Sequence, residues 1–539
     1  MSGFPSPEFN RAAGRDESAV GPRATAMFGL CALAGLASAL ELVATTHGPG
    51  LAWDSVSYLS IGVNIARGQG VSGLSGNAVT LFPPGLPLVA AVGGAIGVGP
   101  QLAVRVFNAV CAALIVVIGH KLLDSAMLRN NVLWGATALL SFSPILLSLN
   151  KMALTEPAFT VMVGLLLLEM QRIWHTRQLN PADALSITVI CSVAFLLRYV
   201  GLVLIAATVL GLMVALPRTR TIAVRVGGVV GAALVVPSAW MARNFVTDGT
   251  LLGNRPRSTD SFSDVIASSV STLAQWTLPV SGAPRTVSAL FLLVLTLAAG
   301  FLHTHNLLDH GGSGLARRTA NLGPAILFCV VYVTFIVFAQ LTITFNRLDS
   351  RLLSPIYLPA FLLATVAVSG ALDWADSVKR KRLASGFLVA MLSFFGLVQI
   401  VGTGQQIRQG LSIGIGYNSD RWRQSETARA ARHLVESESW LVFSNQYPGL
   451  WAATGHQPIM AIPRFADPRD SDPPIDDPLA RFADEVNCSK HRVMLVMFND
   501  GETYSYPIAT IGEVVDIAEI ADLADGSVFE AKAINACIT

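Results

Sequence analysis

Charged residues are scarce in this chain. They make up 13% of its 539 residues, whereas an ordinary soluble domain has about 25%. Hydrophobic residues make up 52%, and the mean hydropathy is +0.55. This composition excludes an ordinary soluble protein and indicates a polytopic membrane protein. The small net charge of +2 gives no sign of a nucleic-acid partner.

Hydrophobic runs, in contrast, are abundant. A membrane-spanning helix needs about 20 apolar residues, and suitable runs lie at about 24–44, 102–122, 132–149, 153–172, 184–216, 221–243, 286–303, 322–343, 353–372 and 384–403. The run 184–216 is too long for one crossing and carries a single charge, Arg198, near its middle. We therefore expect two short helices that meet at residues 198–201.

One further apolar run, 81–98, is ambiguous, and the charges of the loops decide its place. Short loops rich in Lys and Arg lie in the cytoplasm. The basic loops of this chain fall on one side of the membrane only if 81–98 does not cross it. We therefore predict about eleven transmembrane helices, a cytoplasmic N-terminus, and a surface-lying first outer loop that contains 81–98.

The last part of the chain differs from the rest. Residues 404–539 hold most of the acids and show alternating patterns at 440–445, 492–498 and 514–520, which are typical of strands. We predict a small α/β extracytoplasmic domain there, after a disordered cytoplasmic lead (1–23) and a mainly α transmembrane domain (24–403). The predicted fold class is thus a mainly α polytopic membrane protein.

Cysteine is rare, and its placement gives no sign of a zinc site. None of the six cysteines has the spacing of zinc ligands, and four of them lie in apolar runs. Only Cys488 and Cys537 lie in the segment that we place in an oxidising compartment. We expect them to form a disulfide, with two buried thiols as the alternative.

The stretch 53–70 follows the first apolar run and has the pattern of an amphipathic helix at a bilayer surface. Its one acid, Asp54, stands where the helix would begin. Asp54 could therefore be the N-cap of this helix. The alternative is a catalytic carboxylate held at the boundary between lipid and water.

The predicted topology brings several polar residues to the same outer face as Asp54. They are Glu156, Arg198, Tyr199, Arg243, Asn244, Arg347, Asp349 and Arg351. Charges at a membrane boundary are costly unless they are paired or serve a ligand. Two acids with several arginines suit an anionic lipid headgroup and an acid–base step. Glu156 before Pro157 is also an ordinary helix start, and arginines at span ends commonly reach lipid phosphates.

An acid in the first outer loop, followed by a tyrosine four residues later, forms one recognisable motif (Asp54 and Tyr58). Further stretches are FPPGLPL (82–88), MALTEPAF (152–159), LRYVGL (197–202), RLDSRLLSPIYLP (347–359) and VFSNQYPGLWAATGHQPIMAIP (442–463). In their order and topology these stretches resemble the C-type integral-membrane glycosyltransferases. The resemblance is to the bacterial branch related to protein O-mannosyltransferases and the lipid A aminoarabinose transferase.

The chain departs from that pattern at three positions. Ser55 stands where many relatives carry a second acid, Leu352 replaces a tyrosine, and Phe82 replaces a lysine found in the aminoarabinose branch. Donor recognition is therefore expected to differ from that branch.

The resemblance implies a glycosyltransferase that moves a hexosyl or pentosyl unit from a polyprenyl-phosphate donor to a hydroxyl or amine of a glycan, lipid or protein acceptor outside the cytoplasm, with inversion. It implies a multi-pass protein of the bacterial cytoplasmic (inner) membrane. Asp54 would be the catalytic base and Glu156 would orient the acceptor, or the two acids would share a divalent cation. No other cofactor is implied.

The remaining polar residues have two expected roles. Arg198, Arg243, Arg347 and Arg351 would bind the donor phosphate. Tyr58, Tyr199, Asn244 and Asp349 would support the substrate site. Two other classes of function would also place charges at span ends. They are a transporter or lipid flippase, and a non-catalytic protein of cell-envelope assembly.

Overall fold

The protein is described by a computed structural model. It describes residues 20–277, 313–343, 348–377, 381–465, 477–501, 504–535 and 537. Most of the predicted disordered lead, the expected span at 286–303, and Arg347 lie outside these residues.

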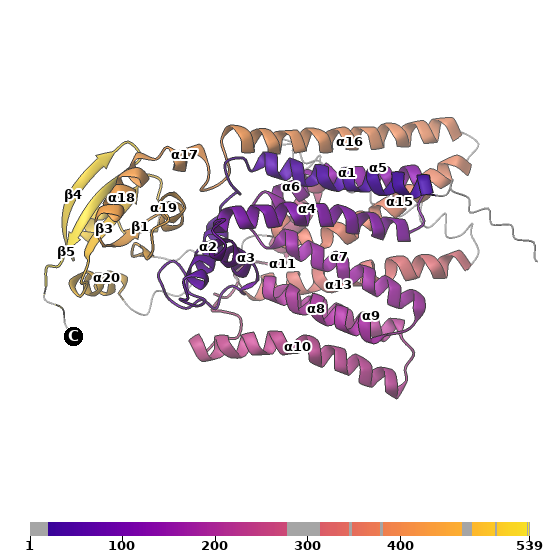
Figure 1. The fold of residues 1–539 in the computed structure, drawn as a ribbon, viewed down its shortest axis with the longest axis horizontal. Coiled ribbons are helices and arrows are strands. Elements are labelled where there is room, and N and C mark those ends of the chain that lie inside the picture. The colour runs from indigo at the N-terminus through magenta and orange to yellow at the C-terminus, as the bar shows by residue number, and fades with distance from the viewer. Residues whose placement is uncertain are drawn as a thin grey trace, which may run out of the picture.

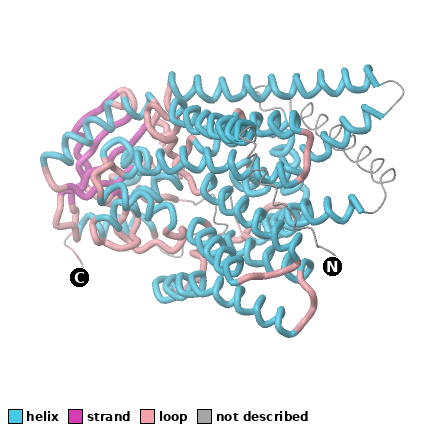
Figure 2. The backbone as a smooth tube through the Cα atoms, turned by 45° about the vertical axis from the view of Figure 1, so that its right-hand side comes forward, coloured by secondary structure: helices cyan, strands magenta, loops and turns pink. Residues whose placement is uncertain are grey.

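Long helices form a bundle along most of the molecule, and the strands gather at one end of it (Figures 1 and 2). We call this end of the bundle the domain end. The bundle helices are α1 (Val20–Ala44), α4 (Pro100–Ser125), α5 (Asn130–Ser141), α6 (Pro144–Asn150), α7 (Glu156–Thr176), α8 (Pro181–Leu197), α9 (Leu202–Ala215), α10 (Arg220–Asp248), α13 (Ser313–Thr342), α15 (Tyr357–Ser377) and α16 (Lys381–Ser412). Among the described residues, six helical stretches are long and apolar enough to cross a membrane, which confirms a polytopic membrane protein.

The apolar run 184–216 is divided at its one charged residue, as predicted. Arg198 has extended backbone angles, with φ −152° and ψ 139°, and therefore ends α8. A single 3-10 turn, Tyr199–Gly201, then leads into α9. A Cβ on Gly201 would lie 2.4 Å from the backbone nitrogen of Phe195, so only glycine fits this close turn.

The run 132–149 is divided as well, which the sequence analysis did not predict. Ser143 caps α6 by accepting a hydrogen bond from the backbone N–H of Leu146 at 3.2 Å, and Pro144 follows at the first helical position. Both features favour a new helix start at this point.

Two short helices, α2 (Trp53–Ala66) and α3 (Gly85–Ala95), lie between the bundle and the sheet (Figure 1). The two helices pack so closely that Gly62 has no room for a side chain. A Cβ at this position would lie 2.5 Å from the Cβ of Ala90. α3 has 11 residues, about half of what a span needs. Leu88, Val92 and Ile96 form an exposed apolar row along it, which suits a helix lying at a membrane surface.

The C-terminal part is a five-stranded mixed sheet with strand order β2-β1-β3-β5-β4. Its elements are α17 (Asp420–Arg423), α18 (Glu426–Ser437), β1 (Trp440–Ser444), α19 (Tyr447–Thr454), β2 (Ile459–Ala461), α20 (Pro478–Asn487), β3 (Arg492–Phe498), α21 (Ile508–Ile511), β4 (Asp516–Leu523) and β5 (Gly526–Lys532). β1 pairs in parallel with β2 and β3, whereas β5 is antiparallel to β3 and β4. The expected α/β domain is confirmed.

Cys488 and Cys537 form a disulfide, with their Cα atoms 4.8 Å apart. This confirms the expected pairing and excludes the alternative of two free thiols. The bond joins the end of α20 to the last described residue of the chain.

The sheet domain is anchored to α2. The indole N–H of Trp53 donates a hydrogen bond to the Tyr447 hydroxyl at 2.6 Å, and Leu51 forms a backbone bridge with Gly416. Apolar residues of α2, α3 and the sheet domain share one core, which includes Leu59 and Trp422. The start of α2, where Asp54 lies, is therefore held from both sides.

Candidate active site

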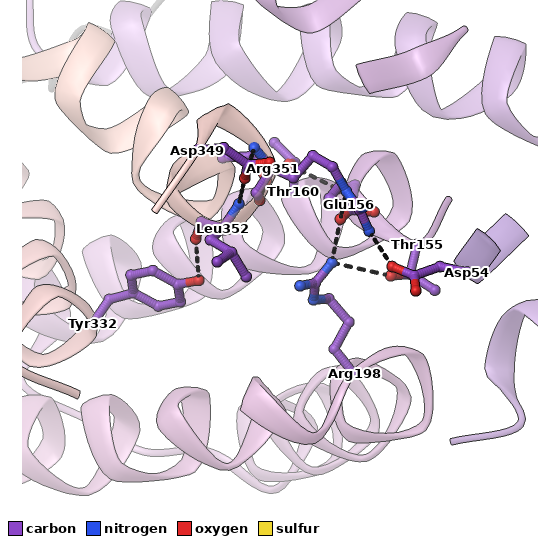
Figure 3. Close-up of polar contacts among 10 residues, drawn as sticks. Asp54, Thr155, Glu156, Thr160, Arg198, Tyr332, Asp349, Arg351 and Leu352 are labelled. Atoms are coloured by element: carbon purple, nitrogen blue, oxygen red, sulfur yellow. Dashed lines mark hydrogen bonds and ion pairs between the residues drawn. The ribbon is translucent and has the colours of Figure 1, made fainter. Parts of the chain in front are cut away.

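Glu156 is the first residue of α7, and its side chain is only 1% exposed. Its carboxylate oxygen Oε1 accepts from two arginines. Arg198 Nη1 lies 2.5 Å away and Arg351 Nε lies 3.1 Å away. Glu156 therefore joins the turn after α8 to the short helix α14 (Ser350–Leu353), as Figure 3 shows.

Asp54 reaches the same group from α2. Its Oδ2 accepts from Arg351 Nη2 at 2.6 Å, and both side chains are 26% exposed. Arg351 thus bridges the two carboxylates (Figure 3). We call Asp54, Glu156, Arg198 and Arg351 the ion-pair group.

Asp54 does not cap its own helix. The N-cap of α2 is Ala52, which makes no side-chain capping bond, and Asp54 lies inside the first turn with its carboxylate directed at Arg351. The capping alternative for Asp54 is therefore wrong, because the cap position belongs to a residue two places earlier.

The second carboxylate oxygen of Glu156, Oε2, is buried and has no hydrogen-bond partner among the described residues. A buried carboxylate oxygen without a partner is costly. It is therefore a place where a hydroxyl of a bound molecule would be favoured.

The arrangement does not fit a divalent cation shared by Asp54 and Glu156. The guanidinium of Arg351 lies between the two carboxylates, where such an ion would have to lie. In the part of the chain that the structure describes, no three His, Cys, Asp or Glu residues form a metal-binding group. We therefore derive no step through a metal.

A second polar group lies near the end of α10. We call Thr80, Tyr199, Trp240, Arg243 and Asn244 the Tyr199 cluster. The Tyr199 hydroxyl donates to the backbone carbonyl of Thr80 and accepts from Asn244 Nδ2 at 2.8 Å and Trp240 Nε1 at 3.2 Å.

Arg243 is a member of this cluster and bonds mainly to neutral oxygens. Its Nη1 donates to the carbonyl of Val79 at 2.6 Å and to Asn244 Oδ1 at 3.0 Å, and its Nη2 donates to the carbonyl of Val71 at 3.4 Å. Arg243 and Asn244 therefore fasten the first loop, residues 67–84, to α10.

Between the two groups lies Arg255, a residue that the sequence analysis did not select. Its Nη2 donates to the carbonyl of Leu81 at 3.4 Å, and it interacts electrostatically with Tyr58, Asp54 and Arg198. Burial lowers the pKa of the Arg255 guanidinium from its ordinary value. The nearby Tyr199, Tyr58 and Asp54 act in the opposite direction and favour the charged guanidinium.

Tyr58 packs beside Asp54 in α2, edge-on to Phe82 at 4.9 Å between ring centroids. Burial and the Asp54 carboxylate both raise the pKa of Tyr58 well above its ordinary value, so the phenol stays neutral.

Asp349 has a clear local role. Its Oδ1 caps α14 by accepting from the backbone N–H groups of Arg351 at 3.0 Å and Leu352 at 3.1 Å. This cap orients the helix from which the Arg351 side chain extends. Arg347, the fourth predicted phosphate ligand, lies outside the described residues.

A cavity of about 580 Å³ opens beside the ion-pair group. Ala52, Arg351 and α11 (Phe262–Thr277) are among the parts of the chain that line it. Its volume lies within the range of about 300–1,000 Å³ that is usual for ligand sites. Of the ion-pair group, Arg351 itself lines this ligand-sized space, and Asp54 and Glu156 lie behind it as the carboxylate partners of its guanidinium.

Comparisons with known proteins give a family match over part of the chain and a similar fold over most of it. Residues 83–229 match the family model of dolichyl-phosphate-mannose-protein mannosyltransferases. No protein with a curated description matches the chain by sequence.

Among solved structures, ArnT from Cupriavidus metallidurans in the apo state is similar over 95% of this chain and 98% of its own, with 13% identity and a TM-score of 0.58. The same protein bound to undecaprenyl phosphate is similar over 92% and 97%, with 12% identity and a TM-score of 0.58. The arabinofuranosyltransferase AftD from Mycobacteria is similar over 94% of this chain but only 40% of its own, with 17% identity and a TM-score of 0.51.

These similarities confirm the resemblance that the sequence motifs indicated. The agreement with ArnT extends over nearly the whole of both chains and includes the bundle and the C-terminal sheet domain. The chain therefore has the fold of ArnT over nearly its whole length and carries, in residues 83–229, a match to the family model of dolichyl-phosphate-mannose-protein mannosyltransferases.

Proposed function

We propose that this protein transfers a sugar from a polyprenyl-phosphate donor to a hydroxyl of an acceptor, with inversion at the anomeric carbon. The observation that carries the proposal is the ion-pair group beside the cavity, on a fold shared with a protein that has been crystallised with undecaprenyl phosphate. Paired charges at a membrane boundary that adjoin a ligand-sized space are the expected form of such a site.

Asp54 is the proposed general base. It takes the proton of the acceptor hydroxyl while that oxygen forms a bond to the anomeric carbon. The bond from this carbon to the phosphate oxygen breaks, and its electron pair leaves with the lipid phosphate. Asp54 suits this role because its carboxylate is partly exposed and adjoins the cavity through Arg351.

The arginines stabilise the leaving phosphate in this proposal. Arg351 and Arg198 are held by carboxylates in the structure, and Arg255 adds a third cation near Asp54. A donor phosphate competes with Asp54 for Arg351, and Asp54 is then free to accept a proton. Phosphate-binding cations of this kind act by stabilising charge that develops in the transition state.

Glu156 holds Arg198 and Arg351 in place, and its unpartnered Oε2 can accept a hydrogen bond from a substrate hydroxyl.

We propose that Arg243, Asn244 and Tyr199 position the first loop over the site. Their hydrogen-bond partners are mainly oxygens of that loop and of one another. Tyr58 and Asp349 support the site by packing beside Asp54 and by capping α14.

We propose that the protein lies in the bacterial cytoplasmic membrane with the sheet domain (404–539) outside, following the transmembrane part (24–403) in the chain and packed against its helices α2 and α3. The distribution of basic loops supports this orientation. The disulfide between Cys488 and Cys537 supports it too, because such bonds persist in oxidising compartments.

A turnover assay tests the function. The purified full-length protein would be given labelled polyprenyl-phosphate mannose and polyprenyl-phosphate arabinofuranose, together with washed membranes from cells that lack it. We expect one of the two labels to enter an acceptor. Movement of intact donor across vesicle membranes without transfer would favour a flippase, and neither transfer nor movement would favour a non-catalytic assembly protein.

A further inference from the structure

The cavity beside Arg351 has a wall that sugar transfer alone does not explain. One face of α11 (Phe262–Thr277) forms it through Asp264, Ser268, Ser271 and Gln275. These residues recur every three or four positions and therefore share one side of the helix. Neither release of a lipid phosphate nor proton transfer to Asp54 requires a row of hydroxyl and amide groups.

This polar face is not simply the solvent side of an amphipathic helix. Phe262 and Ile266 form an exposed apolar face of α11, whereas Val265 and Trp276 are buried. The helix thus has three distinct faces, and the polar one turns to the cavity. A membrane protein that only needed to cover a bundle end would not require the third face.

The orientation of α11 is fixed by two bonds to the segment that carries Arg351. The Thr272 hydroxyl donates to the backbone carbonyl of Leu348 at 2.8 Å, and the indole N–H of Trp276 donates to the Ser350 hydroxyl at 3.2 Å. The polar face and the ion-pair group are therefore two walls of the same site.

The charges around the cavity are mainly negative. Asp260, Asp264 and Asp349 line it, and Arg351, the one cationic lining residue among the described residues, already bridges two carboxylates. Arg198 and Arg255 do not line it. A space lined in this way disfavours an anionic ligand.

We propose that the α11 cavity is the acceptor subsite and that it selects a neutral, hydroxyl-rich glycan over an acceptor that presents a phosphate. This inference rests on the proposed function. Hydroxyl and amide side chains on one helix face match the closely spaced hydroxyls of a sugar, and the aspartates accept hydrogen bonds from them. Inversion requires the acceptor to approach opposite the leaving phosphate. Asp54 bonds to Arg351 at the wall of this acid-lined space and interacts electrostatically with Arg255, which does not line it.

The test uses the full-length protein in lipid vesicles, a labelled polyprenyl-phosphate sugar that supports turnover, and washed membranes from cells lacking the protein as the acceptor source. The variants are Ser271→Leu, which narrows the cavity, and Gln275→Ala. The matched control is Ser263→Leu, since Ser263 lies on the same helix, is exposed and does not line the cavity. Two rates are measured, namely label transferred to the acceptor and label released to water.

Ser271→Leu is expected to lower transfer to the acceptor by about tenfold or more, the scale of a steric change in a specificity pocket. Release to water should stay within about twofold of the parent, because the donor side is intact. Ser263→Leu should change neither rate, and the product should survive mild acid, as a glycosidic bond does.

Three results would overturn the proposal. Equal loss of transfer and of release to water in Ser271→Leu would place the donor in the cavity. Unchanged transfer in both cavity variants would show that no acceptor binds there. A product cleaved by mild acid would show that the sugar was attached to a phosphate. Failure of the parent protein to release or transfer any label would instead refute the proposed function itself.

Discussion

The ion-pair group and the Tyr199 cluster both place arginines near the domain end of the bundle, yet they use them differently. In the ion-pair group, Arg198 and Arg351 bond to the carboxylates of Glu156 and Asp54. In the Tyr199 cluster, Arg243 bonds to backbone carbonyls and to the amide oxygen of Asn244. The first arrangement gathers charge at a cavity, whereas the second fastens a loop.

The difference shows that the partners of an arginine indicate its role better than its place at the end of a span. Carbonyl oxygens satisfy Arg243 without placing a second charge in the site. Burying opposite charges together seldom adds stability compared with apolar packing. The ion-pair group is therefore better explained by a ligand than by stability, and the following predictions test that distinction.

The largest effect is expected at Asp54. Asp54→Asn keeps the size of the side chain but removes the proton acceptor, and a general base contributes a factor of about 10²–10⁴. We expect transfer to fall by that factor with normal membrane insertion, measured with labelled donor. The control is Asp477→Asn, because Asp477 caps α20 in the sheet domain without lining the cavity, and Asn caps helices about as well as Asp. If Asp54→Asn retained a transfer rate within a few-fold of the parent, Asp54 would not be the general base.

Glu156→Gln is expected to cost the most stability. It leaves Arg198 and Arg351 without their shared carboxylate, and breaking a buried pair costs about 3–5 kcal/mol. Thermal unfolding in detergent should show a clear drop in midpoint. A variant as stable as the parent would show that Arg198 and Arg351 find other partners. The folded state would then not depend on the two ion pairs to Glu156.

Arg351→Ala is expected to weaken donor use by about 2–3 kcal/mol, the scale of a lost charged hydrogen bond. The kinetic constants for the donor would be compared with those of the parent. Because Arg351 also holds Asp54, transfer and release to water should both fall. Normal donor kinetics in a folded protein would reject Arg351 as a phosphate ligand.

Arg243→Ala should have the smallest effect on chemistry. We expect it to lower stability by about 1.5–3 kcal/mol, because it removes charged hydrogen bonds to the first loop. Activity per folded molecule should change little. If donor binding weakened as much as in Arg351→Ala, the contrast between the two groups would disappear, and Arg243 would have to be counted as a phosphate ligand.

Much of the candidate site was predictable from the sequence, because topology constrains where charges can meet. The positions of basic loops placed Asp54, Glu156, Arg198 and Arg351 on one face, and the structure brings these four into contact. Strand patterns likewise located β1, β3 and β4.

Other features depended on tertiary contacts that no local pattern reveals. Arg255 lies in a long loop, and only its burial near Asp54 and Tyr58 distinguishes it from other loop arginines. The partners of Arg243 are backbone carbonyls of a loop about 170 residues earlier in the chain, so its residue type gave no hint of them. The sequence left Asp54 open as the cap of α2, but the helix begins at Trp53 with Ala52 at the cap position, and alanine is not a residue that marks a cap.

The most direct test of the central claim uses an acceptor that needs no base. Azide attacks the anomeric carbon without losing a proton, so Asp54→Asn should form glycosyl azide from the labelled donor at close to the parent rate while transfer to hydroxyl acceptors is lost. The glycosyl azide should have the inverted anomeric configuration. Loss of azide transfer in parallel with hydroxyl transfer would contradict the account, because Asp54 would then be needed for donor binding or departure of the phosphate rather than for accepting a proton.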